Sequence, residues 1–521
     1  MSELLDIISA KFDKHLRKCF VLAIILGFAV HGYVISNLMV NHDSIVFLID
    51  SKPDIRSGRW ARVFWGGILS GNYQSPWIIG ITTIIVLAVS ITIVLAFFGN
   101  RKAWQDYLIV AIFVSFPVIA CNFSYMFMSN EYAMALLFAV IGAVTAGRKE
   151  IYCKIIAVFS YIMCCAIYQS YIHVAIVLIA FKFICALFDE EDIKKSIKTV
   201  LINMVVMLVS MVVYYGITAL VLKISGMEIN RDAGLSLNLF TLKMIYVYFR
   251  DYIFRDKAVG GGRLHGILLA LTYMAIALKG SYVLYKRKKE GILRMVLFLL
   301  TFCIMPLCFN ALCLAVGYQT HQLMEFSFVF LYIFPIAFYE RIFDEKECRI
   351  ADYYLAFMML VVTSQNIKFC NTCYYSLGLA YESSYSLANR IATHIEETEG
   401  WKKDTPVLFV GKLGWSETIY GETKPLLKEE LKNVTGYNAG DYVYERGYLL
   451  RYFMNDYLGV KLPEPTEEMQ EEILQSGIID KMQSFPEKGS MEWYKGTLVI
   501  KLSDERVDSS LHKAYKELYV H

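Results

Sequence analysis

Long apolar segments separated by short polar pieces constrain this chain more than any other feature of its sequence. A helix that crosses a bilayer needs about 20 mostly apolar residues. Segments of that kind occupy residues 19–40, 76–98, 105–121, 131–147, 152–168, 172–188, 199–222, 265–285, 292–316, 323–340 and 350–367. With 56% hydrophobic residues, the chain is also too apolar for an ordinary soluble enzyme. We therefore expect an α-helical polytopic membrane protein with about eleven transmembrane helices.

The composition changes near residue 367 to that of a soluble domain. Residues 371–521 contain 17 Lys and Arg against 24 Asp and Glu, a net charge of −7 in a chain whose total is +3. The segments 407–411 and 497–500 are typical of buried strands, and 465–475 is typical of a helix. The sequence thus predicts a transmembrane domain over 1–367 and a small α/β domain over 368–521.

Lysine and arginine in the short loops predict the orientation of the chain. They gather before the first span and in the connections that follow each even-numbered span. The members are Lys11, Lys14, Arg17, Lys18, Arg101, Lys102, Arg148, Lys149, Lys194, Lys195, Lys198, Lys286, Arg287, Lys288, Lys289, Arg341, Lys346 and Arg349. All fall on one side if there are eleven spans, so we expect a cytoplasmic N-terminus and an extracytoplasmic C-terminal domain. Positive charge in this pattern indicates membrane orientation and gives no sign of a nucleic-acid partner.

The first outside loop holds a candidate general base. Asp43, beside His42, directly follows the first span, where a carboxylate could take a proton from an acceptor hydroxyl. Further along, Arg59 and Arg62 lie off the apolar face of an amphipathic segment that begins at Trp60, where guanidinium groups could bind a phosphate. The alternative is a solvated acid and two arginines that bind anionic lipid.

The loop 223–264 offers two more cations. Arg255 and Arg263 flank the glycines 260–262, so a flexible segment could close over a phosphate. These glycines are not a Walker loop, because no Lys-Ser/Thr follows at the required spacing. A surface loop with scattered charge explains them equally.

Polar turns at the outside ends of spans could bind sugar. Glu131, Tyr168, Gln169 and His321, together with His42, combine hydrogen-bonding groups with aromatic rings, as sugar sites require. The alternative is that these polar residues simply end helices at the membrane interface.

Several site types are missing from the sequence. No DxD motif occurs in an outside loop, and no GxSxG, HExxH or paired CxxC arrangement occurs; Cys370 and Cys373 form a lone CxxC. A divalent-metal nucleotide-sugar site therefore has no support in the sequence. The spans also hold few ionisable residues, which argues against an ion-coupled transporter.

The order of motifs resembles the glucosyltransferase II family of serotype-converting O-antigen glucosyltransferases. The resemblance rests on a span followed by Asp43, then Gly58-Arg59-Trp60, then Pro76-Trp77 at the next span, and on the turn Tyr168-Gln169-Ser170. It implies a GT-C-type fold in the bacterial plasma membrane and transfer of a sugar, glucose by analogy, from a polyprenyl-phosphate carrier to a cell-surface glycan. It also implies that no metal and no cofactor is required. By motif, Asp43 would be the base and Arg59 a phosphate contact. Members often carry two acids where this chain has Asp43-Ser44.

Two other functions share the same multispanning body. A flippase for lipid-linked glycans would move its substrate without making a linkage, and a polysaccharide polymerase would make a processive series of products. For a transferase, we expect the lipid-linked donor, the glycan acceptor and membrane lipid as partners, with a separate flippase and donor synthase acting before it.

Overall fold

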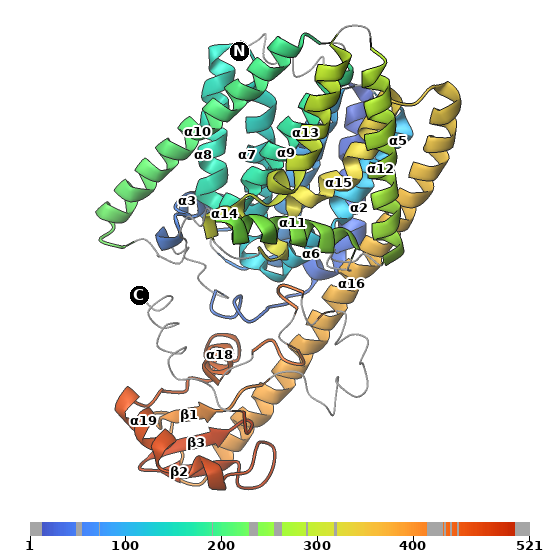
Figure 1. The fold of residues 1–521 in the computed structure, drawn as a ribbon. Helices are drawn as coiled ribbons and strands as arrows, with labels where there is room; N and C mark the ends of the chain where they lie inside the picture. The colour runs from blue at the N-terminus through green and yellow to red at the C-terminus, as the bar shows by residue number, and fades with distance from the viewer. Residues whose placement is uncertain are drawn as a thin grey trace.

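The computed structural model consists of a helical bundle and a smaller C-terminal part joined by one long helix (Figure 1). It describes residues 13–47, 55–71, 73–99, 101–189, 191–228, 238–254, 263–287, 290–316, 320–413, 431, 434–437, 440–444 and 447–505. Within these residues, eight helical stretches are long and apolar enough to cross a membrane. The chain is a multi-pass membrane protein.

The bundle consists of helices of very different lengths. Its long members are α2 (Lys14–Ser36), α4 (Pro76–Phe98), α5 (Ala103–Ser115), α7 (Ser129–Ala146), α8 (Ile151–Tyr168), α9 (Ile172–Phe188), α10 (Ile193–Ile224), α12 (Arg263–Tyr285) and α13 (Gly291–Asn310). Shorter ones are α3 (Ala61–Ser70), α6 (Pro117–Ser124), α11 (Leu239–Phe254), α14 (Leu312–Val316) and α15 (Phe330–Phe338).

The predicted division of 152–188 agrees with the structure. A 3₁₀ turn, Gln169–Tyr171, separates α8 from α9. Cys153 near the start of α8 and Lys182 near the end of α9 line the same cavity, so the two helices run back to the same end of the bundle. The last two expected spans correspond to the nine-residue α15 and to part of α16 (Glu345–Glu397). The count of eleven spans stays a prediction.

A proline breaks the third span. Pro117 begins α6, and Phe116 before it has an extended backbone, φ −61° and ψ 130°, because the proline ring disfavours the helical region for the preceding residue. The buried His31 of α2 contacts the break, with Nε2 2.8 Å from the carbonyl of Val114 and Nδ1 2.6 Å from the Tyr374 hydroxyl. This side chain therefore ties α2, α5 and α16 together.

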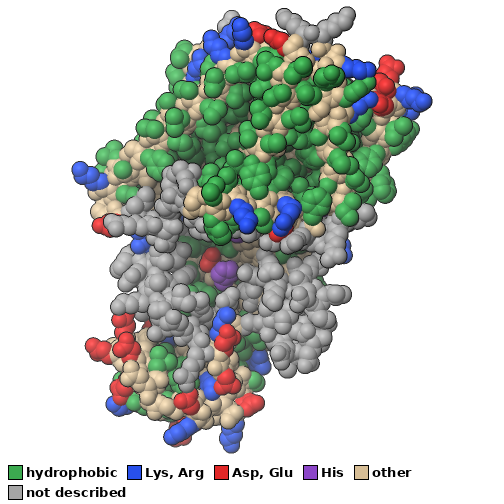
Figure 2. Space-filling model, viewed as in Figure 1, with side chains coloured by type: hydrophobic (Ala, Val, Ile, Leu, Met, Phe, Trp, Pro, Cys, Tyr) green, Lys and Arg blue, Asp and Glu red, His purple; other side chains and the backbone are tan. Residues whose placement is uncertain are grey.

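Cations gather at the end of the bundle farthest from the C-terminal part (Figure 2). Lys102 forms ion pairs with Glu340 and Asp352, and Arg341 forms one with Asp189. These contacts join connections that are far apart in sequence but were predicted to share one side. An apolar belt covers the bundle below them, as expected for a surface that faces lipid.

The expectation of a loop over 223–264 is wrong in part. Residues 239–254 form α11, which lies across the other end of the bundle (Figure 1). Ile245 and Tyr248 are buried while Leu239 and Phe240 are exposed, so one face packs on the bundle and the other carries apolar side chains outward. The apolar run of α11 is too short to cross a bilayer. At the end of the bundle, one face packs on the other helices and the opposite face stays exposed.

The C-terminal part contains the expected α/β elements. Strands β1 (Val407–Val410), β2 (Met491–Tyr494) and β3 (Thr497–Lys501) form a sheet of order β1-β3-β2, with β1 parallel and β2 antiparallel to β3. Leu408 and Val499 pack with Ile473 of α19 (Glu467–Gln475), on the opposite face from α18 (Gly447–Tyr452). The 53-residue helix α16 runs through the predicted boundary at 367 without a break.

Candidate active site

The Gly58-Arg59-Trp60 motif forms a tight turn held by Gln169, which follows α8, and by Tyr214 of α10. Gly58 has a φ of +78°, and a Cβ there would collide with the Tyr214 hydroxyl, so glycine is required. Gln169 donates hydrogen bonds from Nε2 to the Ser57 carbonyl and to the Tyr214 hydroxyl, both at 2.9 Å. Tyr214 in turn donates to the Gly58 carbonyl at 3.2 Å. Gln169 thus orients the turn that presents Arg59.

Arg59 lies over an aromatic ring at this end of the bundle. Its guanidinium carbon is 4.5 Å from the centre of the Tyr168 ring, and Tyr168 packs edge-on against Tyr132 at 4.8 Å. Arg59 Nε is buried and has no hydrogen-bond partner among the described residues. Next in the motif, the Trp60 indole donates to Thr218 Oγ1 at 3.2 Å. The motif fixes the Arg59 backbone but leaves a charged donor unused.

Arg62 forms a buried ion pair. Its Nε donates to a Glu131 carboxylate oxygen at 2.5 Å, and the two side chains are 6% and 4% exposed. On the other face of α3, Val63, Phe64 and Ile68 are each at least half exposed. The predicted amphipathic segment is therefore a helix, with apolar groups outward and Arg62 inward.

The Asn130 amide, next to Glu131, is fully buried, and neither its oxygen nor its nitrogen has a hydrogen-bond partner within the described ranges. Buried polar groups are normally paired. This amide is therefore available to a bound group.

Asp43 lies in a turn after α2 and reaches solvent. Its side chain is 42% exposed, with a carboxylate oxygen 3.7 Å from His42 Nε2. The buried Asn41 holds the turn, because its Oδ1 accepts from the Asp43 amide at 3.1 Å and from the Ser44 hydroxyl at 2.7 Å. An exposed carboxylate on an anchored turn suits a general base.

Helix α6 connects the Asp43 turn with the tyrosines under Arg59. Ser124, its last residue, lies 3.5 Å from Asn41 Nδ2, and Asn122 donates to the Tyr171 hydroxyl at 2.8 Å. Tyr171 packs against Tyr132, which contacts the Tyr168 ring. The structure thereby brings residues from four separate segments to one end of the bundle.

His321 also belongs to this cluster. Burial and the nearby Arg59 cation lower the pKa of its imidazole, so the ring is neutral at neutral pH. The following residue, Gln322, accepts hydrogen bonds from the amide and hydroxyl of Thr435. A segment of the C-terminal part therefore lies against the site.

The side chains of the two other predicted cations, Arg255 and Arg263, lie outside the part of the chain that the structure describes. Arg255 is not among the described residues, and Arg263 begins α12 with its side chain outside them. Their role as phosphate contacts stays a prediction.

One buried acid near the site, Glu325, was not among the residues predicted from the sequence. Glu325 is 1% exposed and accepts a hydrogen bond from the Tyr248 hydroxyl of α11. The signal was an acid inside the expected span 323–340, which was counted as almost free of ionisable residues. Together with Glu131, it weakens that argument against a transporter.

Among the described residues, one group could reach a single metal ion. His15, Cys19 and Asp106 lie together, but Asp106 already binds His15 Nε2 and Arg101 Nε, each at 2.8 Å. The group is an ion-pair network at the cation-rich end, opposite Arg59.

Comparison with known proteins identifies a family. The model of the family described as Glucosyl transferase GtrII matches residues 32–336, more than half of the chain. No curated protein and no solved structure matches. The matched range covers Asp43, Arg59, Glu131 and His321.

Proposed function

Because the chain belongs to the glucosyl transferase GtrII family, it is a membrane glycosyltransferase with a sugar donor and a glycan acceptor, and we propose its substrates and site. The donor is polyprenyl-phosphate glucose, and the acceptor is a hydroxyl of a glycan outside the bacterial plasma membrane. Arg59 carries the proposal, because it is a fixed arginine whose buried Nε has no hydrogen-bond partner in the described part of the chain.

In this proposal Arg59 binds the phosphate of the donor. A guanidinium presents several donors to phosphate oxygens, and its charge stabilises the leaving phosphate as the sugar departs. Arg62 is already neutralised by Glu131, so it acts as a positioning residue that anchors α3. The exposed apolar residues of α3 would lie along the polyprenyl tail.

Asp43 is the proposed general base. The acceptor oxygen attacks the anomeric carbon, the bond from that carbon to the phosphate oxygen breaks, and polyprenyl phosphate leaves with the bonding electrons. Asp43 takes the proton of the acceptor hydroxyl. The neutral amide of Asn130 and the neutral ring of His321 are available to the sugar hydroxyls. Arginine supplies the positive charge, so the proposal includes no metal or cofactor.

The test is sugar transfer in vitro from synthetic polyprenyl-phosphate glucose to a glycan acceptor. We expect Asp43→Asn to lower the rate about 10²- to 10⁴-fold and Arg59→Ala about 10²- to 10³-fold. Asp404→Asn, an exposed acid, and Arg390→Ala, an arginine over the Phe485 ring away from the bundle, are matched controls that should keep full activity.

Other outcomes separate the alternatives. Full activity of Asp43→Asn would exclude Asp43 as the base. A ladder of processive products would favour a polymerase, and movement of the lipid without a new linkage would favour a flippase.

A further inference from the structure

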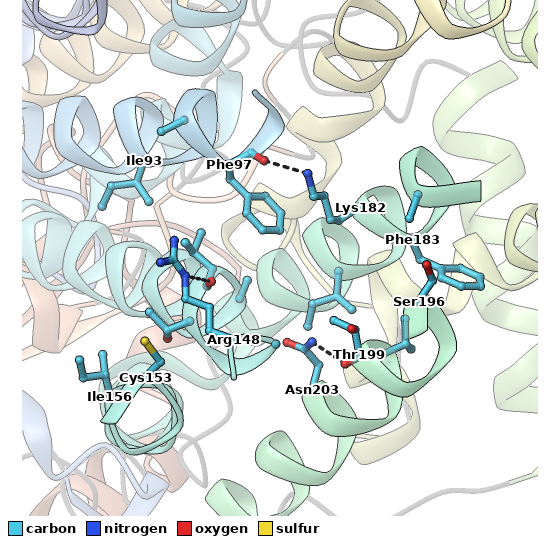
Figure 3. Close-up of a pocket in the computed structure, with 18 of the residues that line it drawn as sticks. Ile93, Phe97, Arg148, Cys153, Ile156, Lys182, Phe183, Ser196, Thr199 and Asn203 are labelled. Carbon is cyan, nitrogen blue, oxygen red and sulfur yellow. Dashed lines mark hydrogen bonds between the residues drawn. The ribbon is translucent and has the colours of Figure 1, made fainter. Parts of the chain in front are cut away.

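A cavity of about 760 Å³ lies at the cation-rich end of the bundle, between α4, α7, α8, α9 and α10 (Figure 3). Its size is in the range of ligand sites. Arg148, which lines it, follows α7 and is 17 residues from Glu131, or about 25 Å along a helix. The cavity is therefore separate from the proposed transfer site.

The walls of the cavity are mainly apolar. Ile93 and Phe97 of α4, Ile156 of α8 and Phe183 of α9 line it. Ala96 and Tyr152, which also line it, are exposed, so the cavity is open on that side. Such a space suits a hydrocarbon chain.

Two cations lie at its rim. Lys182 Nζ donates to the Phe97 carbonyl at 3.3 Å, which uses one of its three donors. Arg148 donates from Nε to the Val144 carbonyl at 3.4 Å. Both groups can bind an anionic oxygen, as a phosphate between them would provide.

Asn203 adds a buried acceptor. It is 3% exposed, and its Nδ2 donates to the Thr199 carbonyl at 2.8 Å, which fixes the amide orientation. Oδ1 then has no hydrogen-bond partner in the described ranges, and Figure 3 shows it on the side away from Thr199, toward Arg148. Glu191, an exposed acid, is also among the lining residues and adds a second acceptor side chain. Two cations for a negative group and two acceptors for a positive N–H group fit a zwitterionic ligand.

We propose that this cavity binds an aminophospholipid from the leaflet at the cation-rich end. The phosphate lies between Lys182 and Arg148, and the ammonium group donates to Asn203 Oδ1 and Glu191. An acyl chain fills the apolar part beside Ile156. A phospholipid with a quaternary ammonium group has no N–H donor and leaves Asn203 unpaired, which costs binding free energy.

The test is lipid binding by native mass spectrometry on the delipidated full chain in detergent. Phosphatidylethanolamine should bind at one site and about fivefold or more tighter than phosphatidylcholine. Lys182→Met should weaken it about fivefold, whereas Lys149→Gln, an exposed cation that does not line the cavity, should not. Asn203→Leu should remove the preference over phosphatidylcholine, and Ala96→Trp should block binding by filling the cavity.

Four results would overturn the proposal. Equal binding of the two lipids would indicate an unspecific lipid shell, and tight binding to Ala96→Trp would place the lipid elsewhere. Stronger binding of phosphatidylglycerol would contradict the role of the ammonium group, and preference for the polyprenyl-phosphate sugar would make the cavity a donor site. The wild-type lipid series decides the question even if a variant does not fold.

Discussion

At the residue scale, the buried Arg62–Glu131 pair should be sensitive to the loss of either charge. Glu131→Gln would leave a guanidinium buried without a counter-charge, and we expect a loss of about 3 kcal/mol in the free energy of unfolding. Thermal unfolding in detergent measures it. The control is Glu472→Gln, which breaks the exposed pair of Glu472 and Lys495 in the C-terminal part and should leave the midpoint unchanged. Equal midpoints for both variants would contradict this role of the pair.

His321 gives a pH dependence whose sign follows from its environment. Burial and Arg59 lower its pKa from the usual 6.5, so below about pH 6.5 the unfolded chain binds this proton more readily than the folded chain. Stability from the neutral ring is therefore present above pH 6.5 and is lost as the pH falls. Between pH 7.5 and 5.5, His321→Gln should lose less stability than the wild type. An identical loss in both would contradict the assignment.

The single residues of the site could be predicted from sequence only in part. The role of Gly58-Arg59-Trp60 could be predicted because one short motif contains both the glycine that forms the turn and the arginine that the turn presents. The pairing of Arg62 with Glu131 could not be predicted, because 69 residues separate the two and both were expected to face a substrate. Glu325 was missed because one acid hardly alters the hydropathy of a long apolar run.

At the scale of elements, a turn over residues 434–437 closes on the end of α6. Gly436 has a φ of +87°, and a Cβ there would collide with Ser124 Oγ, which contacts the Asn41 that anchors the Asp43 turn. Gly436→Ala should displace this contact and lower sugar transfer about tenfold or more. Gly459→Ala is the control that separates backbone strain from a steric collision. Gly459 also has a positive φ, +70°, but no described atom lies within 4 Å of the position of an added Cβ. Equal transfer by the two variants would mean that the turn does not position the site.

Apolar length predicted the elements well where each run is one helix. Residues 76–98 were expected and found as α4 with the same bounds, since Pro76 fixes the start and Gly99 the end. Helix α11 was not predicted, because its 16 residues are too few for a span and include Lys243, Arg250 and Asp251. The segment 323–340 was expected as one helix, but the 3₁₀ turns Phe326–Val329 and Tyr339–Arg341 on either side leave nine α-helical residues.

At the scale of the whole molecule, the two ends of the bundle differ in chemistry. One end gathers the ion pairs of Lys102 and Arg341 with the lipid cavity, and the other holds Asp43, Arg59 and the docked C-terminal turn. The sequence predicted this separation from the charge of short loops alone. It could not predict that the C-terminal part contacts the site, because Gln322 and Thr435 are joined only by tertiary packing.

The orientation of these ends decides whether transfer can occur outside the cell. Cys303 is an exposed native cysteine, so we start from Cys303→Ser and introduce Glu468→Cys on α19 or Lys149→Cys after α7. On intact cells, a membrane-impermeant maleimide should label Glu468→Cys, because the C-terminal part and the Arg59 site share one side. It should reach Lys149→Cys only after permeabilisation, since cations are retained on the cytoplasmic side. The reverse pattern would place Asp43 and Arg59 in the cytoplasm, where a sugar donor presented on the outer face could not reach them.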